Sequence, residues 1–410
     1  MTPDTVSFFG NFGTQNLGNE YTLKAIIHHA RKYLPAASMH CICPDPEDAS
    51  TRHNVRASPM SYRYGKDFRS KAPRTHDNPV IRFLRRLLIR LPRELLEWIK
   101  AFRTLKGTRM LVMTGTGMLG DFGIGPFDLH YEILKWSIIA KVRRSKLLFV
   151  SVGAGPLDHP LSRWIVKFAL SLADYRSYRD SFSKEYLASI GFNTAGDFVY
   201  PDLAFSLTPD FASQTSSRKP RIIGLGLMDY YGKGYTPEHG RGIYQQYVET
   251  IASFVAWLFD HEYTVRLLIG DLAYDQRVKA DVVNLLRRRG PLHPERKIID
   301  EPVSSVEQLI AQLATVDMVV ATRFHNILLA LMLNKPVVAV SYHEKIPSLM
   351  AGVGLAEYCQ TIDHLDAQRL VEQFSKLEQN SDLLKPVIQQ KAEEYRRALD
   401  EQYRHVFNHV

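Results

Sequence analysis

Short apolar runs alternate with longer amphipathic segments along most of the chain. In the first half, apolar runs at residues 6–10, 110–114 and 147–152 each lead into a glycine-rich loop, and an amphipathic segment follows at 20–33. These runs do not alternate with polar residues, which is typical of parallel strands that helices bury on both faces. The pattern therefore predicts an α/β fold built on a doubly wound parallel sheet.

A polar segment at residues 208–220 interrupts this pattern, and a second alternating series begins at residue 221. A chain of 410 residues is also too long for one hydrophobic core, because such cores stop growing at about 250–300 residues. We expect two Rossmann-like parallel-sheet domains facing a cleft. The expected division is an N-terminal domain at 1–207, a linker at 208–220, a second domain at 221–360, and C-terminal helices at 361–410 that cross back to brace the pair.

The elements of the second series follow from the same pattern. Strands are expected at 263–269, 317–321 and 336–341, and helices at 242–261, 273–289 and 324–333. Ligands bind at the carboxyl ends of the strands in open sheets of this kind, so the loops after the strands are the first places to look for chemistry.

Residues 80–106 stand apart because they combine an amphipathic helical pattern with eight basic and two acidic side chains. Pro92 is expected to kink or divide this helix. One interpretation is a helix packed on the sheet with a solvated basic face. The other is a helix that lies in an anionic membrane interface. Residues 52–78, just before it, are polar and rich in Pro and Ser, and we expect a loop there.

The charge balance favours anionic partners, since 52 Lys and Arg exceed 43 Asp and Glu and give a net charge of +9. No zinc-ligand spacing, RNA-binding signature or helix-turn-helix pattern is present, so we expect no nucleic-acid partner and no metal. There is no secretory signal and no apolar run of about 18 residues. The three cysteines give no disulfide framework, and we expect a cytoplasmic protein.

Three glycine-rich loops follow predicted strands. They can bring backbone N–H groups close to an anion or a sugar, although the first can equally be a tight strand-to-helix turn. The second matches GxGxxG but lacks an acidic residue at the end of the following strand, which argues against a dinucleotide site. The candidate ligand contacts in these loops are Gly13, Asn16, Gly18 and Glu20 in the first, Gly115, Gly117 and Asp121 in the second, and Gly153 and Gly155 in the third.

Arg179 and Asp202 follow further along the first domain. An arginine can grip a carboxylate or phosphate with two parallel hydrogen bonds, which a lysine cannot reproduce. The alternative is a structural ion pair with Asp174 or Asp180. The sequence alone leaves both interpretations open.

The segment from Thr322 to Asn326 is the most informative, because it joins a predicted strand end directly to a helix. A helix N-terminus carries partial positive charge, and Arg323 and His325 add side chains suited to binding anions and transferring protons. The next predicted strand ends close to Tyr342 and Lys345, which brings another cation to the same edge. We therefore expect the chemical centre here.

With these residues in view, the chain resembles the polysaccharide pyruvyl transferase family over roughly residues 6–360. The motifs that carry the resemblance are Asn16-Leu-Gly18-Asn19-Glu20, Gly115-Thr-Gly117 with Asp121, Gly153-Ala-Gly155-Pro156, Arg179-Asp180, Pro201-Asp202, and Arg323-Phe324-His325 with Tyr342 and Lys345. Asn19 and Thr116 depart from the family pattern. The resemblance implies a fold like that of the two-Rossmann glycosyltransferases (glycosyltransferase-B-like).

The resemblance also implies a reaction. A pyruvyl group passes from phosphoenolpyruvate to two hydroxyls of one sugar, which gives a cyclic ketal and phosphate. The expected catalytic residues are His325 as general acid, Arg179 and Arg323 as anion holders, and Lys345 beside the departing phosphate. No cofactor is expected beyond the donor substrate.

The expected acceptor is a cell-surface or exopolysaccharide precursor, on a lipid carrier at the inner face of the cytoplasmic membrane. Such an acceptor would give the helix at 80–106 a reason to contact the membrane. A glycosyltransferase of the same fold that uses a nucleotide sugar remains an alternative, as does a non-catalytic membrane-associated assembly subunit.

Overall fold

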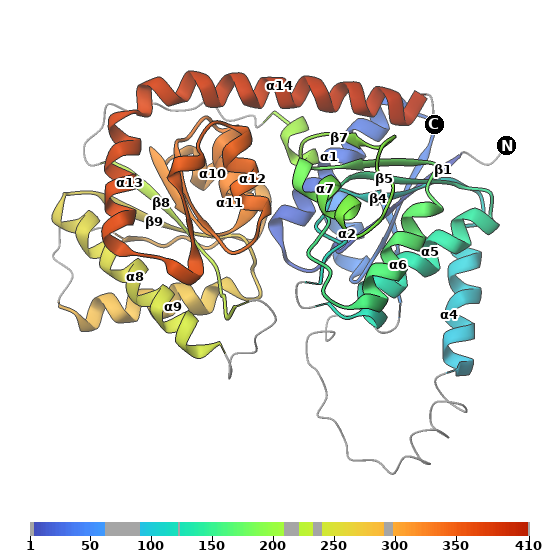
Figure 1. Cartoon of the computed structure of the whole chain (residues 1–410), viewed down its shortest axis with the longest axis horizontal. Helices are drawn as coiled ribbons and strands as arrows, with labels where there is room; N and C mark the ends of the chain where they lie inside the picture. The colour runs from blue at the N-terminus through green and yellow to red at the C-terminus, as the bar shows by residue number, and fades with distance from the viewer. Residues whose placement is uncertain are drawn as a thin grey trace, which may run out of the picture.

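A computed structural model describes residues 4–61, 91–121, 124–208, 221–232, 240–290 and 298–408, and it contains two parallel sheets that lie end to end (Figure 1). The first has the order β3-β2-β1-β4-β5-β6-β7 and the second β10-β9-β8-β11-β12-β13. In both, the order reverses beside the first strand. Ligands bind at such switch points in open α/β sheets.

The strands of the first sheet are β1 (Thr5–Phe9), β2 (Ser38–Cys43), β3 (Arg56–Pro59), β4 (Thr108–Thr114), β5 (Lys146–Val152), β6 (Tyr175–Tyr178) and β7 (Phe198–Val199). Its helices are α1 (Leu17–Tyr33), α2 (Pro46–His53), α4 (Leu91–Thr104), α5 (Tyr131–Val142), α6 (Pro160–Ser171) and α7 (Ser181–Ser189), with the short helices η2 (Pro126–His130) and η3 (Leu203–Ser206). Helices α4, α5 and α6 share one hydrophobic cluster with β1, β4 and β5, so they cover the same sheet face.

The strands of the second sheet are β8 (Ile222–Leu227), β9 (Thr264–Ile269), β10 (Ile298–Ile299), β11 (Met318–Ala321), β12 (Val337–Ser341) and β13 (Cys359–Thr361). Its helices are α8 (Arg241–Asp260), α9 (Asp275–Arg288), α10 (Val306–Ala314), α11 (Phe324–Met332), α12 (Lys345–Gly352) and α13 (Ala367–Gln379), with the short helices η4 (Ala356–Tyr358) and η5 (Ile362–His364).

The last helix, α14 (Ser381–Asn408), extends along both domains (Figure 1). Its 28 residues span about 42 Å. Near its end, Gln402 accepts a hydrogen bond from Ser151 Oγ of β5 at 3.0 Å and donates one to Ser177 Oγ of β6 at 2.6 Å. Tyr403 stacks on His29 of α1 with ring centroids 4.2 Å apart. The tail of the chain therefore ties the two domains together.

One expected segment is wrong, and two others lie largely outside the described residues. The loop expected at 52–78 is wrong at its start, because α2 continues to His53 and β3 follows at Arg56–Pro59. Most of the linker 208–220 and the first part of the helix 80–106 lie outside the described residues. The described part of that helix begins at Leu91, and the kink or division expected at Pro92 stays a prediction. No helix in the described ranges has the length and apolarity to cross a membrane.

Candidate active site

Arg179 enters the site from the first domain, just after β6. Its guanidinium lies against the backbone of Gly153, where an added Cβ would come within 2.4 Å of Nη2, and beside Gly117, where the same distance is 3.4 Å. A side chain at position 153 would therefore displace the guanidinium. Gly117 of the second loop and Gly153 of the third loop therefore leave the space that the Arg179 guanidinium occupies.

The acidic neighbours of Arg179 hold it loosely. Asp180 Oδ2 is 3.4 Å from Nε, and Asp202 Oδ2 is 3.8 Å from Nη1. Neither Arg179 Nε nor Asp202 Oδ2 has a hydrogen-bond partner within the described structure, although both are buried. Burial raises the pKa of Asp202 to about 6, against the opposing effect of Arg179. The guanidinium therefore retains donors for another anion.

The second domain contributes the junction between β11 and α11. Phe324, the first residue of α11, lies beneath two cations from different domains: the Arg179 guanidinium is 5.1 Å from its ring centroid and Lys345 Nζ is 5.5 Å away. Lys345 Nζ also lies 4.8 Å from the Tyr342 ring centroid. Burial lowers the pKa of Lys345 from its ordinary value. Arg179 thus reaches the C-terminal domain, as the expected site requires.

His325 packs directly against the first turn of α1. A Cβ added to Gly18 would come within 1.9 Å of the imidazole Nδ1, so only glycine leaves room for this ring. The Nε2 atom is buried and has no hydrogen-bond partner among the described residues. Burial, and after it the charges of Lys345 and Arg179, lowers the pKa of His325 to about 3. The imidazole is therefore neutral near pH 7 when no anion lies beside these cations.

Arg323 differs from Arg179 because it has a strong internal partner. Its Nε lies 2.9 Å from Asp275 Oδ2 and its Nη2 also bonds this carboxylate. Asp275 is fully buried and accepts further hydrogen bonds from the N–H groups of Gly270 and Asp271. Although burial opposes the charge, Asp275 raises the pKa of Arg323. This pair fixes the start of α11 and occupies donors that the sequence assigned to the substrate.

Several predicted ligand contacts have partners inside the protein. Glu20 is 1% exposed, accepts a hydrogen bond from Gly13 N at 2.8 Å and contacts His53 Nε2 at 2.9 Å. Asp121 Oδ2 accepts hydrogen bonds from the N–H groups of Asp158 and His159 at 2.7 and 2.9 Å, just before α6. These carboxylates hold the glycine-rich loops in place.

The first loop also joins the domains. Asn16 caps α1 by accepting a hydrogen bond from Asn19 N at 3.2 Å, and the next residue, Leu17, donates its N–H to Gly270 O at 3.0 Å. In the second domain, Thr322 Oγ1 lies 2.8 Å from Tyr247 OH. Asn326 is fully buried between Gly226 and Gly270, and neither atom of its amide has a hydrogen-bond partner in the described ranges.

A cavity of about 370 Å³ opens beside the paired cations. Its lining comes from both domains and from α14, and includes Arg179, Asp180, Tyr200, Asp202, Phe324, Lys345 and Tyr395. Gly115 and Gly155 lie in the neighbouring loops. A Cβ at Gly115 would come within 2.9 Å of Ser151 O, and a Cβ at Gly155 would come within 2.3 Å of the Tyr186 ring. A cavity of this size beyond the carboxyl ends of β6, β11 and β12, lined by two cations and a buried carboxyl group, is the candidate active site.

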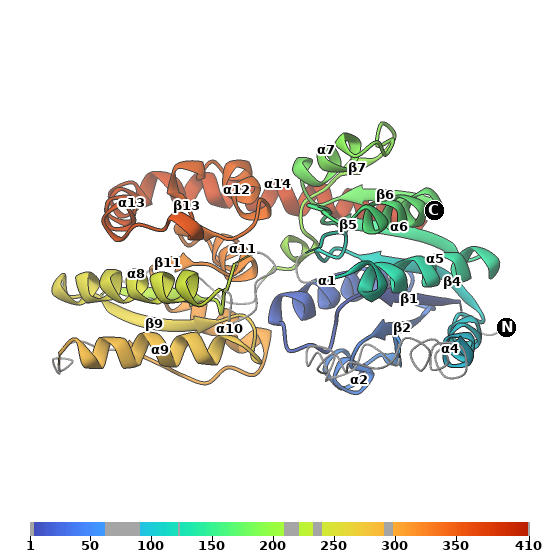
Figure 2. The same ribbon diagram turned by 60° about the horizontal axis from the view of Figure 1, so that its bottom comes forward.

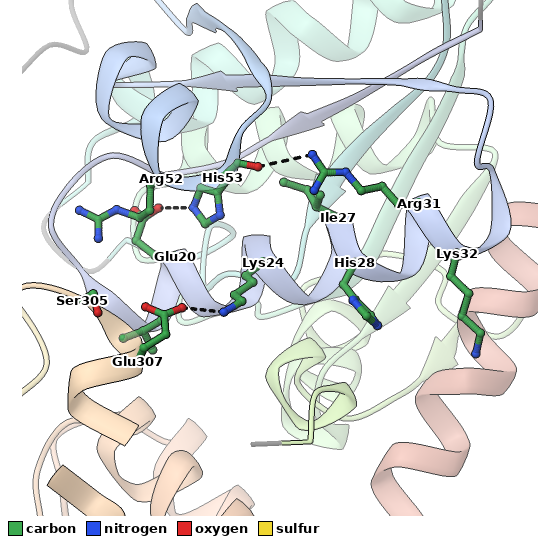
Figure 3. A pocket seen from close by; sticks show the side chains of 11 residues that line it. Glu20, Lys24, Ile27, His28, Arg31, Lys32, Arg52, His53, Ser305 and Glu307 are labelled. Carbon is green, nitrogen blue, oxygen red and sulfur yellow. Dashed lines mark hydrogen bonds and ion pairs between the residues drawn. The ribbon is translucent and has the colours of Figure 1, made fainter. Parts of the chain in front are cut away.

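A larger cavity, about 690 Å³, lies between α1, α2 and the start of α10 (Figure 3). Its cations already have partners. Lys24 pairs with Glu307 at 2.6 Å, and Arg31 donates to Asn54 O at 2.9 Å. The smaller cavity is the better candidate, because Arg179 Nε and Asp202 Oδ2 there have no hydrogen-bond partner among the described residues.

The family follows from comparison with known proteins. The model of the polysaccharide pyruvyl transferase family matches residues 16–344. The chain belongs to this family. The match spans Gly18, Arg179, Asp202 and His325 and stops one residue before Lys345, which lies 5.5 Å from the Phe324 ring centroid in the structure. No curated protein matches the chain.

Solved structures show that this family member has the two-domain fold of glycosyltransferases and sugar-nucleotide epimerases. It is similar to the UDP-GlcNAc 2-epimerase from Methanocaldococcus jannaschii (TM-score 0.58, 12% identity, 90% and 92% of the two chains covered). It is also similar to the UDP-GlcNAc 2-epimerase from Neisseria meningitidis bound to UDP-GlcNAc (0.57, 11%, 97% and 100%). A glycosyltransferase from Rickettsia africae matches as well (0.55, 11%, 100% and 100%). At these identities the likeness concerns the fold, and it confirms the expected glycosyltransferase-B-like architecture.

Sequence reasoning missed Asp275 as the partner of Arg323 and Phe324 as the ring that both Arg179 and Lys345 contact. Asp275 carried a weak signal, since it stands at the start of a helix just after an apolar strand. Phe324 carried none, because its role depends on Arg179 arriving from the other domain.

Proposed function

We propose that this protein transfers the pyruvyl group of phosphoenolpyruvate to two hydroxyls of one sugar in a polysaccharide precursor, which forms a cyclic ketal and releases phosphate. One observation carries the proposal within the family: Arg179 and Lys345, from different domains, lie 5.1 and 5.5 Å from the Phe324 ring centroid and line the same cavity. Phosphoenolpyruvate carries a carboxylate and a phosphate. Two cations that meet at one ring beside a cavity suit such a double anion.

The two cations suit different tasks. The Arg179 guanidinium is planar and can bind a carboxylate or phosphate through two parallel hydrogen bonds. Lys345 is a point charge, and it would balance the charge on phosphate as the C2–O bond breaks. Arg323, held by Asp275, acts as a positioning residue in this proposal, because its ion pair fixes the first turn of α11 and so the place of His325.

The proton transfers follow from the bonds that change. His325 gives a proton to the methylene carbon, which becomes a methyl group, while the first sugar hydroxyl adds to C2 and returns its proton to the imidazole. The second hydroxyl then adds to C2 as the bond to phosphate breaks, and its proton leaves with the phosphate. The two hydroxyl protons thus end on the methyl group and on the phosphate. The proposal needs no cofactor besides phosphoenolpyruvate.

Binding of the donor gives the first test. Phosphoenolpyruvate should raise the melting temperature, whereas UDP-sugars and GDP-sugars should not. Losing a charge-assisted hydrogen-bond pair costs about 1.5–3 kcal/mol, so Arg179→Ala should weaken phosphoenolpyruvate binding by about 10- to 100-fold. Arg397→Ala, on the exposed surface of α14, is the matched control and should bind normally.

Turnover gives the second test. Phosphate release from phosphoenolpyruvate should require a sugar acceptor with two neighbouring hydroxyls, and NMR should detect a new ketal methyl group. Stabilisation by a nucleotide sugar and not by phosphoenolpyruvate would instead support a glycosyltransferase. Tight phosphoenolpyruvate binding with no phosphate release from any polysaccharide precursor would favour a non-catalytic assembly subunit.

A further inference from the structure

Helices α4, α5 and α6 form a layer on one face of the first sheet (Figures 1 and 2). The residues that face the sheet are buried in one cluster, for example Ala101 of α4, Trp136 of α5 and Val166 of α6. The opposite sides of the three helices therefore point away from the sheet. We call this outer side the α4–α6 face.

The α4–α6 face gathers most of the exposed large hydrophobic side chains. Thirteen such side chains are exposed in the described part of the chain, and nine of them belong to α4, η2, α5 or α6. These nine are Leu91, Leu95, Leu96, Ile99, Phe102, Phe127, Val142, Trp164 and Phe168. A concentration of this kind marks a surface that contacts another partner, because single exposed apolar residues are normally scattered.

Contacts of exposed aromatic side chains occur at two places on this surface, one between α4 and α5 and one within α6. Arg143, at the end of α5, places its guanidinium 3.6 Å from the Phe102 ring centroid of α4 and donates a hydrogen bond from Nε to Phe102 O at 2.8 Å. On α6, Trp164 and Phe168 stack on each other with centroids 5.5 Å apart while remaining exposed. Aromatic rings at a water boundary are typical of side chains that sit at the level of lipid headgroups.

The charges on the same helices are mainly positive. Exposed basic residues are Arg93, Lys100 and Arg103 on α4, Arg144 just after α5, and Arg163 on α6. The acidic residues of α4 are engaged nearby: Glu97 lies 2.9 Å from Lys100 Nζ, and Glu94 accepts a hydrogen bond from Tyr131 OH. Cations that border leucine and aromatic side chains match the composition of interfacial membrane helices.

We propose that the α4–α6 face is a docking surface for an anionic lipid bilayer. Leu95, Ile99 and Trp164 would enter the boundary between headgroups and acyl chains, and the bordering arginines would contact lipid phosphates. Electrostatics favour this occupant over a second copy of the chain. In a symmetric dimer the same patch meets itself, so the arginines would face one another. The inference does not depend on the pyruvyl transfer reaction.

Flotation of the full chain with lipid vesicles tests the inference. Vesicles with about 30% phosphatidylglycerol should carry the protein upward, pure phosphatidylcholine vesicles should carry much less, and 0.5 M salt should weaken binding because it screens the charges. The double variant Leu95→Ser, Ile99→Ser should lower partitioning by about tenfold, since both side chains would otherwise become buried in the bilayer. Arg103→Glu reverses one exposed charge on α4. Loss of one basic contact alone should lower binding about fivefold, because each such contact contributes about 1 kcal/mol near an anionic surface.

Matched variants on α14 control for loss of exposed surface. Leu383→Ser, Val387→Ser removes apolar side chains that are 75% and 42% exposed, and Arg397→Glu reverses an exposed charge. These variants should float like the unchanged protein, and equal melting temperatures would show that folding is intact. Failure to float with anionic vesicles, equal loss in the α14 variants, or a lipid-free dimer that Leu95→Ser, Ile99→Ser dissociates would each overturn the inference.

Discussion

His325 must gain a proton when phosphoenolpyruvate binds, if it is the acid of the reaction. With a pKa of about 3 in the protein alone, only about one imidazole in ten thousand is protonated at pH 7. The pKa must therefore rise by about four units, which corresponds to about 5 kcal/mol of favourable interaction with the charged ring. The donor substrate has to supply this interaction.

The anionic groups of the substrate are strong enough. One negative charge about 4 Å from the imidazole contributes about 4 kcal/mol at an effective dielectric constant of 20, or about three pKa units. A carboxylate and a phosphate that both come within about 4 Å of the ring would together exceed the required four units. They would also offset Lys345 and Arg179, whose charges add to burial in keeping the ring neutral. Binding at pH 7 should therefore be accompanied by uptake of about one proton at His325.

Calorimetry in two buffers of different ionisation enthalpy measures this uptake, because the difference in binding heat is proportional to the number of protons exchanged. His325→Asn should bind phosphoenolpyruvate, take up about one proton fewer than the unchanged protein, and release no phosphate. His28→Asn, an exposed histidine on α1, should behave like the unchanged protein. Equal proton uptake with and without His325, or turnover by His325→Asn, would refute the role as acid.

Three further outcomes follow from the contacts of the site and of the first sheet. Gly18→Ala should lower kcat, because its Cβ would displace the His325 ring. The activation free energy should rise by at least as much as the free energy of unfolding falls, and an unchanged kcat would disprove that contact. Asp275→Asn should cost about 3–5 kcal/mol in urea unfolding, since it leaves Arg323 buried without its carboxylate, whereas Asp382→Asn, fully exposed on α14, should cost almost nothing. Burial lowers the pKa of His40 to about 4, so the unfolded chain binds more protons than the folded chain between pH 6.5 and 4. The free energy of unfolding should therefore fall by up to about 3 kcal/mol as the pH drops through that window. Melting curves of His40→Asn should show a smaller fall.

The sequence predicts well those features that depend on neighbouring residues along the chain. The junction of β11 and α11 was visible because an apolar run of strand length leads without a loop into a helical pattern. In contrast, β2 was missed, since His40 interrupts its apolar run, and only Ser7 Oγ and Ser58 Oγ from neighbouring strands explain how that histidine is buried. The partner of Arg323 was missed for a similar reason, because Asp275 lies 48 residues away. Contacts between distant segments leave no periodic pattern to read.

Arg179 and Arg323 show why position alone cannot assign a role. Both follow a strand at the cleft, and both were expected to hold anions. Arg323 is neutralised by a fully buried carboxylate, whereas Arg179 has only loose contacts with Asp180 and Asp202. The pKa of Asp202, about 6, allows it to accept a proton near neutrality, so an arriving double anion need not be repelled by it. Protonation of Asp202 would then release Arg179 from its weak internal partner at the moment the substrate binds. Calorimetry distinguishes the two protons. The His325→Asn variant should lose only the uptake at His325 and should keep any uptake at Asp202.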